Sequence, residues 1–92
     1  MKYKVLSKTE SELHPEKTHI TSYGPYNSKE QAMHHAMWYA GNDKYSAFKE
    51  LRMIPENVPK VKKTKDTVSL IISGVGEDYD NITITYYLEE IV

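Results

Sequence analysis

The sequence predicts a two-layer α+β fold, in which a mainly antiparallel sheet of three to four strands carries its helices on one face. Three observations indicate this class: an alternating segment near the start of the chain, a helix with a clear N-terminal cap, and a long hairpin at the end. The expected order of elements is β-β-α-(α)-β-β. Residues 1–92 are expected to form a single domain.

The first two strands are expected before the helix. Residues 2–7 form the first, because Tyr3 and Val5 alternate with lysines, as in a strand with one buried face. The polar segment 9–17 is expected to be a loop. Residues 18–23 are rich in β-branched and aromatic side chains, which favours a second strand before a glycine-proline pair.

One main helix and a short second helix are predicted next. Asn27 or Ser28 can cap the main helix, and Gln31 can bond back to the cap in a capping-box pattern. The pair Gly41-Asn42 is typical of a helix end, so the short second helix is predicted over residues 43–53. At about 100° per residue, one face of the main helix collects Ala32, Met33, Ala36, Met37, Tyr39 and Ala40.

The end of the chain predicts a hairpin. Residues 55–66 are expected to be a connection, since they carry prolines and lysines. Residues 67–73 and 82–91 are the two strands, joined by a turn over 74–81. Their apolar side chains are expected to face one another across the pair: Val68, Leu70 and Ile72 on the first strand, and Ile82, Ile84, Tyr86 and Leu88 on the second.

Composition excludes several classes of protein. With 39% hydrophobic and 27% charged residues and a net charge of −1, the chain has neither a disordered nor a membrane composition. It contains no cysteine, and no apolar run is long enough to cross a bilayer. The first residues lack the apolar core of a secretory signal. A soluble cytoplasmic protein with no membrane partner is therefore expected.

Catalytic and metal-binding motifs are absent from the sequence. His34 and His35 are adjacent, so on a helix they diverge by about 100° and do not easily share one ion. The acidic segment 76–81 departs from a calcium loop, because Ile82 stands where an oxygen ligand is needed, and it is expected to be a solvated hairpin tip. No catalytic residue, cofactor or metal site is predicted, and the chain is not expected to be an enzyme.

A lysine-rich segment offers one route to function. Lys60, Lys62, Lys63 and Lys65 lie together with no acid among them, and such a run can neutralise phosphates in weak, salt-dependent nucleic-acid binding. The pI of about 6.4 lies below the basic balance of a dedicated nucleic-acid binder. Nucleic-acid binding through these lysines is therefore the alternative hypothesis, and a solvated, edge-protecting segment is the plainer interpretation.

Aromatic residues offer the favoured route. Eight of the residues are tyrosine, a side chain enriched at interfaces, and periodicity leaves two bulky aromatics exposed. Trp38 lies on the His34 and His35 side of the main helix, and Tyr87 lies on the outer face of the last strand. These four are the candidate protein-binding residues. The competing interpretation is that residues 44–54 fold back over Trp38 and bury it.

Two resemblances are generic. The segment GPYNSKEQAMHHA is similar to the strand-to-helix junction of many small α/β modules, and the Lys-, Glu-, Tyr- and Ile-rich usage is similar to that of small proteins of phages and mobile elements. Together the observations predict a small non-catalytic protein-interaction module, a regulator, inhibitor or adaptor. Its partner is expected to be another protein or a second copy of the chain, as a homodimer.

Overall fold

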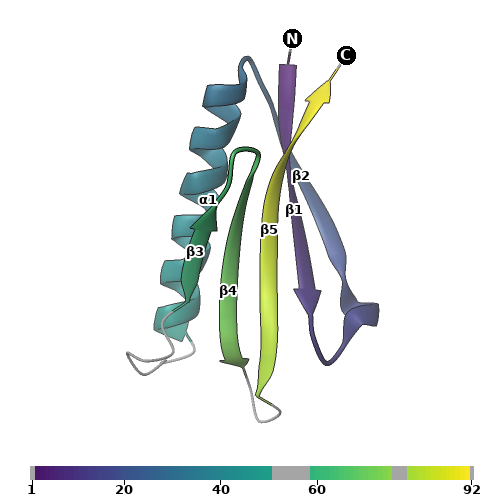
Figure 1. Cartoon of the computed structure of the whole chain (residues 1–92), viewed down its shortest axis with the longest axis vertical. Helices are drawn as coiled ribbons and strands as arrows, with labels where there is room; N and C mark the ends of the chain where they lie inside the picture. The colour runs from purple at the N-terminus through teal and green to yellow at the C-terminus, as the bar shows by residue number, and fades with distance from the viewer. Residues whose placement is uncertain (1, 51–58, 76–78, 92) are drawn as a thin grey trace.

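The computed structural model describes residues 2–50, 59–75 and 79–91, and within them a single antiparallel sheet carries one long helix on one face (Figure 1). The sheet has five strands in the order β2-β1-β5-β4-β3. The elements are β1 (Lys2–Ser11), the short 3₁₀ helix η1 (Pro15–Lys17), β2 (His19–Tyr26), α1 (Lys29–Glu50), β3 (Lys60–Lys63), β4 (Thr67–Val75) and β5 (Asp80–Ile91).

The α+β class and the antiparallel sheet are confirmed, whereas the number and order of elements are corrected. The described residues form β-β-α-β-β-β, with five strands instead of three to four and one helix instead of two. The central strand of the sheet is β5, and β1 pairs with it along the whole length of β1, from Lys2 opposite Ile91 to Ser11 opposite Ile82. Strands from the two ends of the sequence therefore lie side by side.

The core forms where the alanine stripe of α1 meets the sheet. Ala32, Ala36 and Ala40 are fully buried, as are Val5 on β1 and Val68 on β4. A helix that presents only alanine to a sheet lies close against it, because no long side chain separates the two backbones. The larger members of the predicted stripe are displaced to its flanks: Met33 and Tyr39 are partly buried, and Met37 is exposed.

The terminal hairpin follows the predicted pattern, with longer strands. Val68 lies opposite Tyr86, Leu70 opposite Ile84, and Ile72 opposite Ile82, so the predicted apolar pairs share the helix-facing side of the sheet. The strands continue to Val75 and resume at Asp80. The turn is thus shorter than 74–81, and its residues 76–78 lie outside the described part of the chain.

The helix begins as predicted and passes through its predicted end. The Ser28 Oγ accepts a bond from the Gln31 N–H at 3.1 Å, and the Gln31 side chain accepts one from the Asn27 N–H at 2.8 Å. Gly41 does not stop the helix, because the tertiary contacts on both sides of it outweigh its weak helix propensity. Ala40 is buried, and the Tyr86 hydroxyl donates to the Asp43 carboxylate one turn later. Among the described residues, no helix is both long enough and apolar enough to cross a membrane.

Part of the predicted connection 55–66 is the edge strand β3. Val61 lies opposite Leu70 and is partly buried against the core, which holds the strand in the sheet. The lysines on either side of Val61 made the segment resemble a loop. On an edge strand, however, lysines remain in solvent and discourage pairing with another chain.

Asp80 is a structural anchor, so the prediction of a solvated tip over 76–81 is corrected at this residue, whereas Tyr79 and Asn81 are exposed and 76–78 lie outside the described residues. Only 9% of the surface of Asp80 is exposed. Its carboxylate accepts bonds from the Ser11 hydroxyl and, at 3.0 Å, from the Leu13 N–H, so it fastens the start of β5 to the turn after β1. The strand β1 consequently extends to Ser11, into the segment 9–17 that the sequence predicted as a loop.

The continuous helix predicts that replacing Gly41 with alanine stabilises the protein. A Cβ at Gly41 would meet no atom within 4 Å, and alanine favours a helix by about 0.5–1 kcal/mol over glycine. We expect a gain of about that size in the free energy of unfolding, measured by urea titration. Gly74→Ala is the matched control: it also has open space, but its φ of +69° disfavours a side chain, so it should destabilise. A loss of stability in Gly41→Ala would show that the helix ends there.

The Asp80 anchor predicts a pH-dependent difference in stability. The Ser11 hydroxyl bond and then the Leu13 N–H bond lower the pKa of Asp80 below its usual value of about 3.9. A depressed folded-state pKa stabilises the fold above the unfolded pKa, and this contribution is lost as the pH falls through the folded pKa. Asp80→Asn should therefore lower the urea midpoint at neutral pH, with the difference from wild type closing in acid. A difference that is equal at both pH values would contradict the role of the charge.

Candidate functional site

The outward side of α1 carries an exposed tryptophan. Trp38 exposes 59% of its surface, His34 is exposed and His35 is half-buried. His34 and His35 lie four and three residues before Trp38, so both are neighbours of Trp38 on the helix surface. Residues 44–50 continue the same helix instead of folding back over Trp38, and 51–54 lie outside the described residues.

A stack of rings supports this side of α1 from β2. Tyr26 stacks on His35 and Tyr23 stacks on Tyr39, each with ring centroids 4.3 Å apart. Trp38 meets Tyr39 edge to face, with centroids 5.4 Å apart and planes at 73°. Tyr23 and Tyr26 of β2 thus hold Tyr39 and His35 in place, and Trp38 packs against Tyr39. We refer to these residues as the aromatic cluster: Tyr23, Tyr26, His35, Trp38 and Tyr39.

A hydrogen bond joins two tyrosines of the aromatic cluster. The hydroxyls of Tyr26 and Tyr39 lie 2.9 Å apart. Burial, and then this hydrogen bond to Tyr39, raise the pKa of Tyr26 to about 12. The Tyr26 hydroxyl therefore stays protonated at physiological pH. The hydrogen bond holds Tyr39 in place beside Trp38.

Two hollows adjoin His34 on opposite sides. One, of about 330 Å³, is lined by His34, His35, Trp38 and Tyr39. The other is a groove of about 530 Å³ beside α1 and β3, lined by Lys29, Glu30, Met33, His34, Met37, Lys63 and Lys65. His34 borders both hollows, and their lining residues extend from the β3 lysines to Trp38. We call this region the α1 surface.

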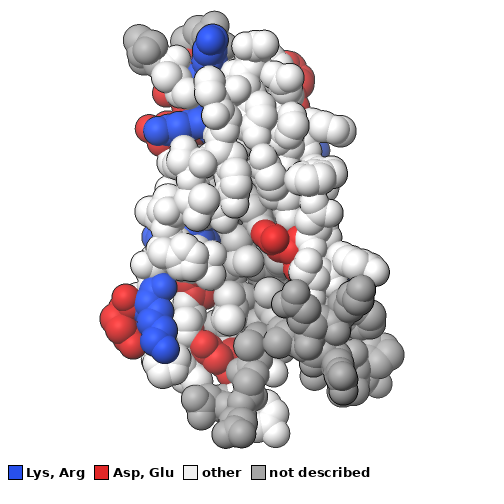
Figure 2. All heavy atoms as spheres, turned by 180° about the vertical axis from the view of Figure 1, so that it is seen from behind, with Lys and Arg blue, Asp and Glu red and all other residues white. Residues whose placement is uncertain are grey.

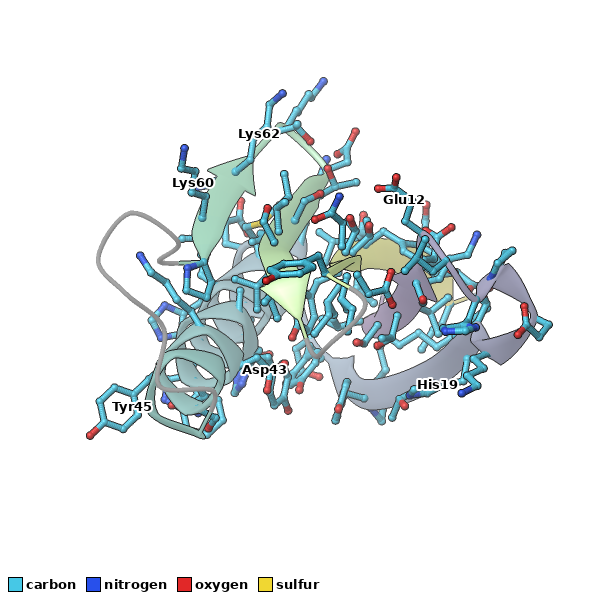
Figure 3. The ribbon with its side chains drawn as sticks, turned by 90° about the horizontal axis from the view of Figure 1, so that it is seen from below. Glu12, His19, Asp43, Tyr45, Lys60 and Lys62 are labelled. Carbon is cyan, nitrogen blue, oxygen red and sulfur yellow. The ribbon has the colours of Figure 1, made fainter. Side chains whose placement is uncertain are left out.

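Tyr45 lies on the same side of α1 as Trp38, and the sequence did not predict it as part of the site. It lies seven residues after Trp38, which returns to the same side of a helix after two turns. It exposes 66% of its surface, and Figure 3 shows its ring directed away from the body of the molecule. The spacing was visible in the sequence, but the predicted break at Gly41-Asn42 placed Tyr45 on a separate helix and hid the register.

Tyr87, the other predicted anchor, lies on the opposite side of the sheet. Its neighbour Tyr86 is buried beneath α1, and successive side chains of a strand alternate between faces. Tyr87 stands between Leu6 and Thr67 on the outer face and is half-buried. The sheet therefore separates it from Trp38, and the structure does not bring the two predicted anchors into one site.

The predicted lysine segment is divided between the two faces. Lys60 and Lys62 lie opposite Ile71 and Ser69, and Figure 3 shows both pointing away from the side of α1. Lys63 and Lys65 border the groove beside α1 instead. The four lysines consequently do not form one basic patch.

The one tryptophan of the chain makes the exposure of this site measurable. With 59% of its surface exposed, Trp38 should be quenched by iodide in the native protein almost as strongly as in the urea-unfolded chain. Stern–Volmer titration of the fluorescence measures this, with N-acetyltryptophanamide as the reference. Weak quenching with blue-shifted emission would contradict the exposed position.

The charged residues of the α1 surface line the groove beside β3, whereas the hollow beside Trp38 is lined by His34, His35, Trp38 and Tyr39. Seen from behind, residues other than Lys, Arg, Asp and Glu predominate over the middle of this face, although an acidic side chain lies among them, and further charged residues lie toward the two ends (Figure 2). Among the described residues, no three His, Cys, Asp or Glu side chains are grouped as a metal would need. The chain matches no protein-family model, no curated protein and no solved structure, so its function is inferred from the geometry of this surface.

Proposed function

We propose that this chain is a small non-catalytic protein-interaction module, a regulator, inhibitor or adaptor, that binds another protein through the α1 surface. The observation that supports it best is the exposure of Trp38 above a fixed ring stack. Tryptophan is among the residues most enriched at binding hot spots. A large apolar ring left in water beside a hollow is typical of a site that a partner covers.

The aromatic cluster supports the proposal by fixing the anchor before binding. Tyr39 is held by its stack on Tyr23 and by its bond to Tyr26. Side chains that are already ordered lose less conformational entropy when a partner docks, which leaves more of the contact energy for affinity.

The groove next to His34 indicates the chemistry of the partner. Met33 and Met37 give it an apolar wall, and methionine adapts its shape to different apolar side chains. Lys63 and Lys65 lie at its border, whereas Lys29 forms an ion pair with Asp66 at 2.5 Å. An apolar segment flanked by acidic residues would complement this groove, with its carboxylates facing the two lysines.

Nucleic-acid binding is the alternative proposal, and the geometry supports it less. Lys60 and Lys62 lie on one face of the sheet and Lys63 on the other, so a single backbone would not contact all of them. The logarithm of the affinity for nucleic acid would fall linearly with the logarithm of the salt concentration, because binding to phosphates releases counterions. Binding that survives nuclease and high salt is therefore the outcome that separates the two functions.

The first experiment is capture of partners with the tagged protein from lysate of the source organism, with and without nuclease, followed by mass spectrometry. For a partner retained in both conditions, we expect Trp38→Ala to weaken binding by roughly 30-fold or more, the effect of losing a hot spot of about 2 kcal/mol. Titration calorimetry with the purified partner measures this change.

Two further variants make this result interpretable. Tyr79→Ala removes an aromatic side chain that is 80% exposed and directly precedes β5, and it should leave affinity unchanged. Tyr87→Ala tests the outer sheet face. If Tyr87→Ala abolishes binding while Trp38→Ala does not, the partner binds the sheet instead. If Trp38→Ala unfolds the protein, by circular dichroism, Trp38 is a core residue and the proposed anchor is wrong.

A further inference from the structure

The two edges of the sheet differ in length and charge. The strand β3 has four residues, three of them lysine, and lysines on an edge discourage pairing with other strands. The strand β2 has eight residues and contains no Lys, Arg, Asp or Glu. In the described part of the chain, β2 pairs with β1 on one side and lies at the edge of the sheet on the other. Only one of the two edges is protected.

The first half of β2 is also uncovered on both faces. Residues 19–22 are all exposed, and Ile20 exposes 56% of its surface. The contacts with α1 come later, through Tyr23 and Tyr26. Figure 3 shows His19 at the far end of the molecule from the helix. The backbone edge is therefore accessible along this half of the strand.

The residues of this half favour strand pairing, and the second half limits it. Ile20 and Thr21 are β-branched and Tyr23 is aromatic, which suits them to cross-strand contacts. Pro25 has no N–H to donate, and the register with β1 shifts in this region. The segment able to accept a new strand is therefore 19–23, about the length of an average strand.

We propose that β2 pairs antiparallel with β2 of a second copy of this chain, about a two-fold axis at Thr21. This register places Ile20 opposite Ser22 of the second copy, and His19 opposite its Tyr23. The result is one continuous sheet of ten strands, five from each copy. A two-fold axis perpendicular to the sheet keeps each face on its own side, so both α1 helices lie on the same face.

Self-complementarity favours a second copy over the strand of a different protein. No Lys, Arg, Asp or Glu stands in this register, so no two like charges face each other across the axis. The residue on the axis, Thr21, meets its own equivalent, and threonine pairs stabilise antiparallel strands. The opposite edge fails this condition, because pairing β3 with itself would bring its lysines together. The inference is independent of the proposed binding function of the α1 surface.

The test uses opposite charges on the axis. Thr21→Lys and Thr21→Glu each place two like charges face to face, so each variant should self-associate at least tenfold more weakly than wild type in sedimentation equilibrium. An equimolar mixture of the two should recover the association, because a lysine then faces a glutamate. Ile71→Glu, an exposed change on β4 that faces Lys60 and lies away from β2, is the control and should associate as wild type does.

A measurement on the unmodified protein accompanies the variants, in case Thr21 changes disturb the fold. Hydrogen exchange at residues 19–23 should slow as protein concentration rises, while exchange in β3 stays constant. Wild type that remains monomeric at millimolar concentration overturns the proposal. Association that the charges at Thr21 do not change overturns it too, as does protection of residues 19–23 only when a different protein is bound.

Discussion

The contact between three alanines and the sheet is the constraint on which the rest of the structure depends. Ala32, Ala36 and Ala40 let α1 lie directly on β1, β4 and β5, so the core is thin and its apolar volume comes mainly from the strands. In the part of the helix whose side chains the structure describes, residues 29–46, the large side chains lie on its flanks or its outer side. The methionines border a groove, the histidines and Trp38 face outward, and the site is a consequence of the packing.

The strand β2 links this packing to the site. Its end supplies the rings that stack on His35 and Tyr39, while its beginning extends beyond the helix as an accessible edge. One strand therefore fixes the candidate anchor on one face and offers hydrogen-bonding groups along its side. The hydrogen bonds of Asp80 to Ser11 and Leu13 hold the connection from β1 toward β2. They thereby help to position both the ring stack and the accessible edge of β2.

The sequence was informative wherever one local signal decided the structure. The capping box at Ser28, the alternation around Val5 and the apolar pairs from Val68 onward are short-range patterns, and the structure confirms them. It was misleading where tertiary contacts outweighed local preference. Gly41 remains helical because Asp43 is bound by a residue from the last strand, and Val61 holds a lysine-rich segment in the sheet. The placement of Tyr87 and Trp38 on opposite sides also required strand order, which no local pattern contains.

The pairing of β1 with β5 has a consequence for how the chain acquires its structure. β1 is synthesised before the other strands of the sheet, yet its inner neighbour β5 comprises residues 80–91. On the ribosome, β1, β2 and α1 can assemble from consecutive chain, but the inner edge of β1 stays open until β5 emerges. The pairing of β1 with β5 joins segments that lie far apart in the sequence. The entropy lost in closing so long a loop slows folding. Until then the nascent chain presents a second open strand, which a chaperone or a neighbouring nascent chain can occupy.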